Sequence, residues 1–248
     1  YEVMMPVGNQ LDLKNRYGNA FVGNLDGKLL AEIKYGDLRA ENVRADAELY
    51  LSYGKAFISG VQNLNGQLSY GELRLNEAKE VQFDSKYSDI SIERAVALRV
   101  TSKYDDFELG NIDDLRLQTK YSDVKLKTVR AAYITAQYSD LKIGYISESL
   151  DAGQTYGSLQ LDMLPKNFRD INLEGKYTDY KMALDKSAAC RFKVEYKNTD
   201  IKLPAAATYR TEQEDGGMRS ARGYIYDSNA KGFIAAKLQY GGFVIVPK

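Results

Sequence analysis

Apolar and polar residues alternate along most of the chain, on both sides of a tyrosine that recurs every 17 or 18 residues. In one copy, Leu115 and Leu117 lie six and four residues before Tyr121, and Val124 and Leu126 lie three and five residues after it. Alternation with a period of two turns one face of a short strand inward. The inward parity changes just after the tyrosine, so each repeat is predicted to be two strands joined by a bend.

The recurring tyrosines extend almost from one end of the sequence to the other. They occur at Tyr17, Tyr35, Tyr53, Tyr70, Tyr87, Tyr104, Tyr121, Tyr138 and Tyr156, and then at Tyr177, Tyr196 and Tyr240. Glycine, serine or aspartate follows most of them, and then usually Asn or Asp, which are residues that suit a tight bend. A fixed period of this kind indicates a repeat architecture.

A repeat of 17–18 residues with two strands is too short to hold a helical crossover between parallel strands. The sequence therefore predicts an all-β, single-domain parallel β-helix (a solenoid) of 17–18 residues per rung and roughly 12–13 rungs. A right-handed coil is expected because parallel crossovers strongly prefer that hand. A left-handed β-helix built on hexapeptides has rungs of similar length, but the pattern lacks a six-residue step.

Within one domain over residues 1–248, the strength of the repeat predicts four segments. Residues 1–16 are expected to form an N-terminal cap, 17–203 the regular rungs, 204–232 an irregular loop or distorted rung, and 233–248 the final rung. Cys190 precedes Tyr196 in the register of an inward position, so we expect a buried thiol without a reactive role.

The overall charge and composition exclude several classes of function. The chain has 34 basic and 34 acidic residues, so its charge does not favour nucleic-acid binding. It lacks any apolar run of about 18 residues, so no transmembrane segment is expected. The sequence contains no histidine and one cysteine, which removes Ser-His and Cys-His catalysis, His-based metal sites and internal disulfides. We expect no cofactor.

Two polar columns accompany the tyrosines in the middle repeats. Asp89, Asp106, Asp123 and Asp140 each lie two residues after a tyrosine. Stacked carboxylates repel one another unless they bind a cation such as calcium or face neutralising neighbours. Lys86, Lys103 and Lys120 lie just before the tyrosines and offer that neutralisation, so a turn-forming role is favoured over a metal site.

The tyrosine column is the candidate binding feature, represented by Tyr87, Tyr104, Tyr121 and Tyr138. As a surface stripe it could contact sugar rings or the apolar groups of a protein partner. The favoured alternative is an inward aromatic ladder with its hydroxyl groups directed outward. The small residues Ser85, Ser102, Thr119 and Ala136, two positions earlier, would make room for it.

The recurrent unit of Tyr, Gly or Ser, Asp and two spaced aliphatic residues, whole in residues 35–40, 87–92, 121–126 and 138–143, resembles a bacterial family. The segments 203–209 and 240–243 are similar to that family's C-terminal part. The family consists of domain-of-unknown-function proteins that carry an adhesin label. The resemblance implies a β-helical fold and a periplasmic, outer-membrane-associated or secreted location, with any signal peptide already removed. It transfers no catalytic residues.

Together these features predict a non-enzymatic, adhesin-like scaffold that presents a flat solenoid face to a glycan or a surface protein. The alternative is a polysaccharide-active lyase or hydrolase that works through carboxylates, as glycoside hydrolysis needs only two of them. A spacer without a specific ligand is a third possibility. A localised function is expected where the repeat fails, at Pro165 to Arg169 and Leu203 to Gly232.

Overall fold

The computed structural model describes residues 2–213 and 215–248 and divides the chain into two compact units, one ending at Asp113 and one beginning at Asp114. Residues 1 and 214, which fall in the predicted cap and the predicted irregular segment, lie outside the described residues. Apart from one short 3-10 turn, Asp215–Gly217, the described elements are all strands. The predicted all-β class is confirmed. None of the described residues belongs to a helix that could cross a membrane.

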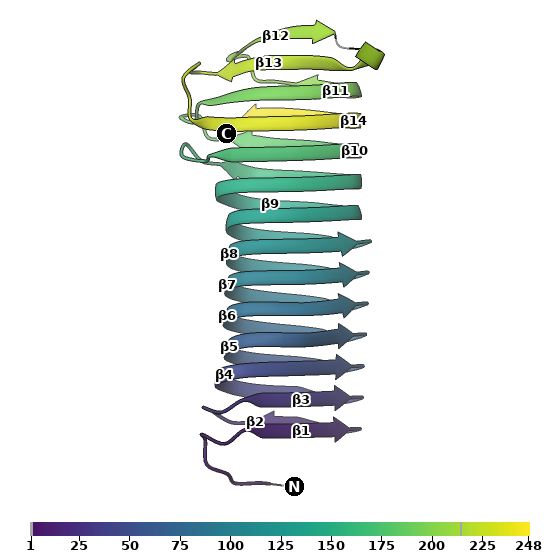
Figure 1. The fold of residues 1–248 in the computed structure, drawn as a ribbon, viewed down its shortest axis with the longest axis vertical. Helices are drawn as coiled ribbons and strands as arrows, with labels where there is room; N and C mark the ends of the chain where they lie inside the picture. Colours follow the sequence, from purple (N-terminus) through teal and green to yellow (C-terminus); the bar gives the residue numbers. More distant parts are fainter. Residues whose placement is uncertain (1, 214) are drawn as a thin grey trace. The chain divides into compact units, whose positions relative to one another are not determined.

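The first unit is a parallel coil of strands (Figure 1). Its strands are β1 (Leu11–Arg16), β2 (Ala20–Val22), β3 (Leu29–Lys34), β4 (Leu38–Ser52), β5 (Lys55–Ser69), β6 (Glu72–Lys86) and β7 (Asp89–Lys103), while β8 (Asp106–Lys120) contains the boundary between the units. The first half of β4 pairs with β2 and its second half with β3, both in parallel. Each turn of the chain therefore adds one strand to each of two legs, which is the predicted β-helical arrangement.

Ladders of apolar side chains fill the interior of this coil. In one ladder, Leu38, Ala56, Leu73 and Ile90 are successive register partners, and each is at most 2% exposed. These residues lie three positions after their tyrosines, as the alternation predicted. Since neighbouring parallel strands lie about 4.8 Å apart, each ladder is a continuous column of van der Waals contact.

The difference between 18-residue and 17-residue repeats is absorbed by a bulge. The pairing of β4 with β5 is regular up to Val43 opposite Val61 and resumes with Asp46 opposite Asn63. Two residues of β4 thus face a single residue of β5. The bulge lets the corners and both legs stay in register although the spacing of the tyrosines changes.

The second unit contains β9 (Asp123–Leu164), β10 (Asp170–Leu184), β11 (Cys190–Lys202), β12 (Ala207–Gln213), β13 (Arg219–Ile225) and β14 (Gly232–Pro247). Strand β14 lies between β10 and β11 and pairs in parallel with both (Figure 1). The prediction that residues 233–248 form the final rung is therefore wrong in position. The sequence could not show this, because the order of strands along the chain does not reveal that a later strand inserts between two earlier ones.

The segment predicted as an irregular loop, 204–232, is largely a hairpin. Strand β13 pairs antiparallel with β11, and β12 pairs antiparallel with β13. The hairpin covers the edge of β11 and interrupts the parallel stacking. Such a cover protects a sheet edge that would otherwise offer unpaired backbone groups.

Tyr196 is not a corner residue, which corrects the predicted repeat. The left-handed conformation in β11 belongs to Asn198, with φ of 50°, and the register places Lys197 opposite Gln239, one residue before Tyr240. Asn adopts this conformation more readily than most residues. Cys190 is fully buried, as predicted, and burial raises the pKa of its thiol to about 12.

One aromatic side chain in the second unit occupies space that a glycine leaves. Tyr180 is 1% exposed and donates a hydrogen bond from its hydroxyl group to the Glu174 carbonyl oxygen at 2.9 Å. A Cβ atom at Gly175 would lie 2.4 Å from a ring carbon of Tyr180. The hydrogen bond therefore holds the Tyr180 ring in place, and the ring fits there because Gly175 has no side chain.

Gly175→Ala is expected to destabilise the protein by about 2 kcal/mol, because the added methyl group overlaps the Tyr180 ring. Gly153→Ala is the control, since nothing lies within 4 Å of its added Cβ and it is the neighbour of Glu174 in the register. Denaturant unfolding would measure both variants. Equal stability of the two would contradict the packing described, whereas Tyr180→Leu should partly rescue Gly175→Ala.

Candidate functional site

The recurring tyrosines of the first unit form a stack on its surface. From Tyr17 to Tyr104, successive ring centroids are 4.8–5.2 Å apart and the ring planes differ by at most 12°. The rings are 38–73% exposed. The favoured interpretation of an inward aromatic ladder is therefore wrong, and the predicted residues Tyr87 and Tyr104 are neighbours on the surface.

The second unit carries its own stack, formed by Tyr121, Tyr138, Tyr156, Tyr177 and Tyr240. The centroids are 4.8–4.9 Å apart and the planes differ by at most 14°. Tyr121 and Tyr138, the other two predicted binding residues, are thus also adjacent and exposed.

A left-handed backbone conformation explains why the tyrosines point outward. All eleven stacked tyrosines have φ between 51° and 61°, a region that costs a non-glycine residue about 1–2 kcal/mol. This single residue changes the direction of the strand and switches which alternate positions face inward, so the residue after the tyrosine points into the coil. Ser88, Ser122 and Ser139 at this next position are at most 5% exposed. The small residues before the tyrosine make room for this inward side chain and not for the ring.

The stacking limits what the tyrosines can bind. Each inner ring has its two faces against its neighbours, so the exposed parts are ring edges and hydroxyl groups. Lysine side chains also lie close to some rings, with the Lys103 Nζ atom 5.0 Å from the Tyr104 centroid and the Lys34 Nζ atom 5.5 Å from the Tyr35 centroid. These contacts compensate part of the backbone strain. The stack is thus mainly a stabilising element of each unit.

Inward serine side chains bond the corners of successive turns together. The Ser139 hydroxyl group donates to the Gln137 carbonyl oxygen at 2.9 Å and accepts a hydrogen bond from the Ser122 amide at 3.1 Å. The same arrangement joins Ser88 to the Lys86 carbonyl oxygen at 2.8 Å. These bonds satisfy backbone groups that the sharp corner leaves unpaired.

Asp105 takes the place of serine in this inward column. It is 1% exposed, accepts hydrogen bonds from the Ser85 hydroxyl group at 2.5 Å and the Ser88 amide at 2.8 Å, and belongs to the first unit. Burial raises the pKa of its carboxyl group from 3.8 to about 6, although both hydrogen bonds favour the ionised form. The corner thus holds a carboxyl group that titrates close to neutrality.

The exposed aspartates two residues after the tyrosines have a different role. In the first turns, an Asp37 carboxylate oxygen accepts the Lys55 amide at 2.9 Å, and the Asn19 side chain accepts the Asp37 amide at 3.0 Å. Asp89 and Asp106 of the first unit and Asp123 and Asp140 of the second occupy the equivalent exposed position, two residues after a tyrosine. Among the residues that the structure describes, no group of three or more Asp, Glu or Cys side chains is placed to hold a metal ion.

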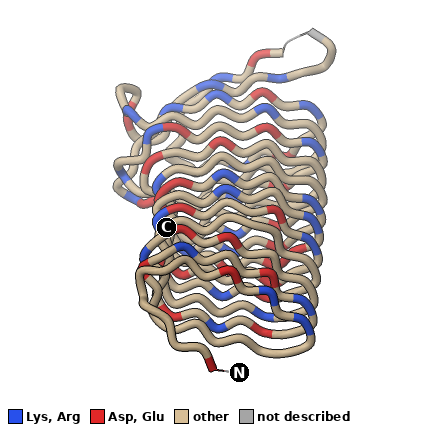
Figure 2. Tube along the Cα trace, turned by 60° about the horizontal axis from the view of Figure 1, so that its bottom comes forward, with Lys and Arg blue, Asp and Glu red and all other residues tan. Residues whose placement is uncertain are grey.

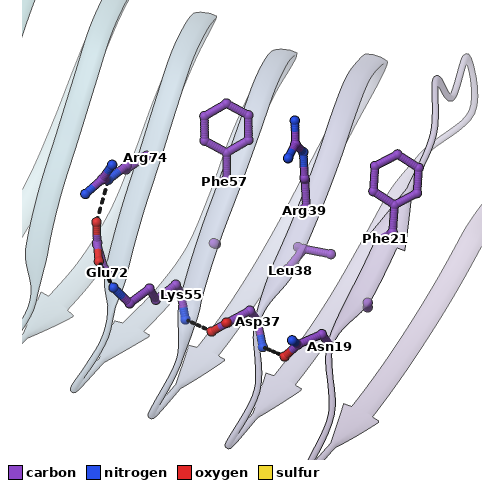
Figure 3. Close-up of a pocket in the computed structure, with 11 residues that line it drawn as sticks. Asn19, Phe21, Asp37, Leu38, Arg39, Lys55, Phe57, Glu72 and Arg74 are labelled. Atoms are coloured by element: carbon purple, nitrogen blue, oxygen red, sulfur yellow. Dashed lines mark hydrogen bonds and ion pairs between the residues drawn. The ribbon is translucent and has the colours of Figure 1, made fainter.

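A shallow groove on the first unit gathers aromatic and charged side chains that the sequence prediction missed. It has a volume of about 490 Å³ and runs across the first leg after the corner on four successive turns. Its most distinctive feature is the Phe–Arg column, which we define as Phe21, Arg39, Phe57 and Arg74. Adjacent members are register partners, and Figure 3 shows the rings and guanidinium groups alternating on one face.

The polar edge of this groove is a chain of contacts beside the Phe–Arg column (Figure 3). Lys55 Nζ lies 2.7 Å from a Glu72 carboxylate oxygen, and Arg74 lies 2.5 Å from the other. The hydrogen bond from Lys55 contributes most to lowering the pKa of Glu72. This carboxylate is therefore fixed in its ionised form and position.

Two side chains of the column remain available to a ligand. Phe21 is 66% exposed, and the Arg39 Cζ atom lies 5.4 Å from the ring centroid of Phe57. Arg39 is exposed and makes no ion pair with any residue that the structure describes. The sequence did contain a signal for this column, because Phe and Arg alternate four residues after Tyr17, Tyr35, Tyr53 and Tyr70. The alternation indicates a binding surface only when the column is known to face solvent, which the structure shows.

Charges elsewhere follow the repeat. Within each unit, basic and acidic residues recur on successive turns and are interspersed (Figure 2).

The segment around Pro165 to Arg169, which the sequence predicted as a place for a localised function, is the turn between β9 and β10. The Phe–Arg groove is the stronger candidate because it combines the exposed ring of Phe21 and the half-buried ring of Phe57 with ordered charges.

The geometry defines a class of protein: a β-solenoid whose turns are closed by outward-stacked tyrosines. The sequence model of the Toastrack DUF4097 family matches residues 47–224, and the chain belongs to this family. Neither the curated proteins nor the solved structures include a match to the chain. The predicted relationship to a family of unknown function with a β-helical fold is confirmed, whereas the adhesin role stays a prediction.

Tyr87→Ala is expected to destabilise the protein more than Tyr87→Gly, by about 1 kcal/mol, because only glycine relieves the left-handed strain. Both variants lose the stacking. At a regular strand position such as Glu80, the order should reverse, since glycine costs more than alanine there. Chemical denaturation measures both pairs, and the same order at the two positions would contradict the strained corner.

Asp105 is expected to make stability depend on pH. Its folded pKa lies above its unfolded value, so the stabilisation is present at pH 4 and lost as the pH rises through about 6. The free energy of unfolding of the native chain, compared with that of Asp105→Ser, should fall by about 2 kcal/mol between pH 4 and 7. Asp106→Ser, in the adjacent exposed column, is the control. A difference between native protein and Asp105→Ser that does not change with pH would refute the raised pKa.

Proposed function

We propose that the protein is a non-enzymatic scaffold that binds an extended glycan along the Phe–Arg groove of its first unit. The observation that carries this proposal is the alternation of rings and guanidinium groups at Phe21, Arg39, Phe57 and Arg74 on four successive turns, with the Phe21 ring exposed and the Phe57 ring half-buried. Aromatic rings contact the apolar faces of sugars, and planar charged groups donate hydrogen bonds to their hydroxyl groups.

The repeat of the solenoid favours an extended ligand. Successive members of the column are about 4.8 Å apart, which is close to the length of one sugar unit in an extended chain. Phe21 and Phe57, two turns apart, would then contact alternate sugars, while Arg39 and Arg74 would contact the sugars between them. The backbone ladder makes this spacing rigid, so little ordering is needed on binding.

The carboxyl groups of the groove support binding over catalysis. Glycoside hydrolysis needs one carboxylic acid with a raised pKa to protonate the leaving group. The pKa of Glu72 in the groove is lowered, whereas the raised value belongs to Asp105, which is buried beneath a corner. The polysaccharide-active alternative therefore lacks a suitable acid at the place where a sugar would lie.

A location in the cell envelope or outside the cell is part of this proposal. An extended polysaccharide is encountered at a cell surface, and the fully buried thiol of Cys190 gives the chain no reactive sulfur to protect there. The adhesin-like role would follow from the glycan-binding first turns of the first unit.

Phe21→Ala/Phe57→Ala is expected to weaken binding to the glycans recognised on an array by about tenfold or more, because both contact rings are lost. Tyr133→Ala removes an exposed aromatic ring, 56% exposed, from the other unit and serves as the control. Affinity would be measured by calorimetry on the array hits, with circular dichroism to verify folding.

Two results would overturn this proposal. The first is equal affinity of the native chain and the Phe21→Ala/Phe57→Ala variant. The second is release of shorter glycans during incubation with the native protein, abolished by Glu72→Gln, which would identify an enzyme.

A further inference from the structure

A second shallow groove of the first unit lies against the strands that lead into the corners, before the stacked tyrosines rather than after them. It has a volume of about 540 Å³. We define it as the cationic groove, lined by Lys14, Arg16, Glu32, Lys34 and Tyr50. Its residues come from β1, β3 and β4, three successive turns, and belong to the first turns of the unit, as does the Phe–Arg groove.

The charges of the cationic groove are unbalanced. Lys14 Nζ is 3.1 Å from a Glu32 carboxylate oxygen, which leaves Arg16 and Lys34 without an ion pair to any residue that the structure describes. These two residues are register partners on β1 and β3. Their backbones are therefore about 4.8 Å apart, and like charges directly opposite each other on adjacent strands are destabilising.

The tyrosine stack holds these cations close to the corner. The Arg16 Cζ atom lies 5.7 Å from the Tyr17 ring centroid, and Lys34 Nζ lies 5.5 Å from that of Tyr35. Those two rings are stacked with centroids 5.2 Å apart. The cationic groups thus lie beside one another with a spacing set by the turns, while Tyr50, 41% exposed, lies opposite Glu32 on the next turn.

We propose that the cationic groove binds the carboxylate or sulfate groups of an acidic polysaccharide, a proposal that rests on the glycan-binding function above. Arg16 can hold such a group through two parallel hydrogen bonds, and Lys34 adds a second positive charge on the next turn. Bound anion relieves the repulsion between the two cations. The exposed Tyr50 ring supplies an apolar contact for the adjoining sugar.

The test uses the full chain with polygalacturonate, dextran sulfate and neutral dextran as probes, at low ionic strength. Arg16→Gln/Lys34→Gln should weaken binding of at least one acidic polymer by about tenfold and make the affinity less dependent on salt. Lys86→Gln/Lys103→Gln is the matched control, because these lysines are register partners in the same column and neither lines the cationic groove. The control should change the affinity by less than about twofold.

Three outcomes would overturn the inference: equal losses in both double variants, native protein that binds neither acidic polymer, or inorganic sulfate that binds as tightly as the polymers. The first would indicate a diffuse charge effect and the last a site for a free anion. The Phe21→Ala/Phe57→Ala variant, which changes only the Phe–Arg groove, distinguishes failure of this inference from failure of the proposed function. If neutral glycans bind through the Phe–Arg groove while acidic polymers do not bind, the cationic groove alone is refuted.

Discussion

Each unit of this protein depends on one residue per turn that adopts a left-handed backbone conformation at the corner. Tyrosine is a poor choice for that conformation by itself, yet it occurs there eleven times with φ between 51° and 61°. Stacking of the rings at 4.8–5.2 Å, together with the hydrogen bonds of inward residues such as Ser139, offsets the strain. Because every ring contacts the next, the repeat itself adds to the stability of each corner.

This constraint also decides which side chains are available for binding. The corner reverses the parity of the strand, so positions two and four residues after the tyrosine face solvent together with positions one and three residues before it. The Phe–Arg groove uses the first pair of columns and the cationic groove uses the second. The Phe–Arg groove arises where Phe21 and Phe57 occupy a column that is polar in later turns, as at Ser91, and the cationic groove where Tyr50 occupies a column that is polar on the next turn, at Gln67. The outward columns can therefore vary without loss of the fold, and both proposed binding surfaces lie on them.

The C-terminal part of the second unit shows a different use of the same repeat. Strand β14 carries Tyr240 and fits between β10 and β11, where Asn198 takes the corner conformation. The antiparallel hairpin of β12 and β13 then covers β11. A parallel stack exposes an edge at its end, and an antiparallel cover changes the hydrogen-bonding pattern that another chain would have to match. The insertion thus places β14 within the parallel stack while the hairpin occupies the edge of β11.

The sequence by itself determined the β-helical class, the 17–18-residue repeat and the inward ladders, since these follow from local alternation and the recurring corner residues. It also identified Cys190 as buried. It did not determine the direction of the tyrosines, because the inward and outward alternatives differ in one dihedral angle that the pattern of apolar residues does not encode. Nor did it reveal the place of residues 233–248, because their strand pairs with β10 and β11, which come earlier in the chain and are not adjacent to it in sequence. The grooves emerged only when the tertiary structure aligned Phe21, Arg39 and Phe57 on one exposed face, since residues 18 apart become neighbours only through the stacking of turns.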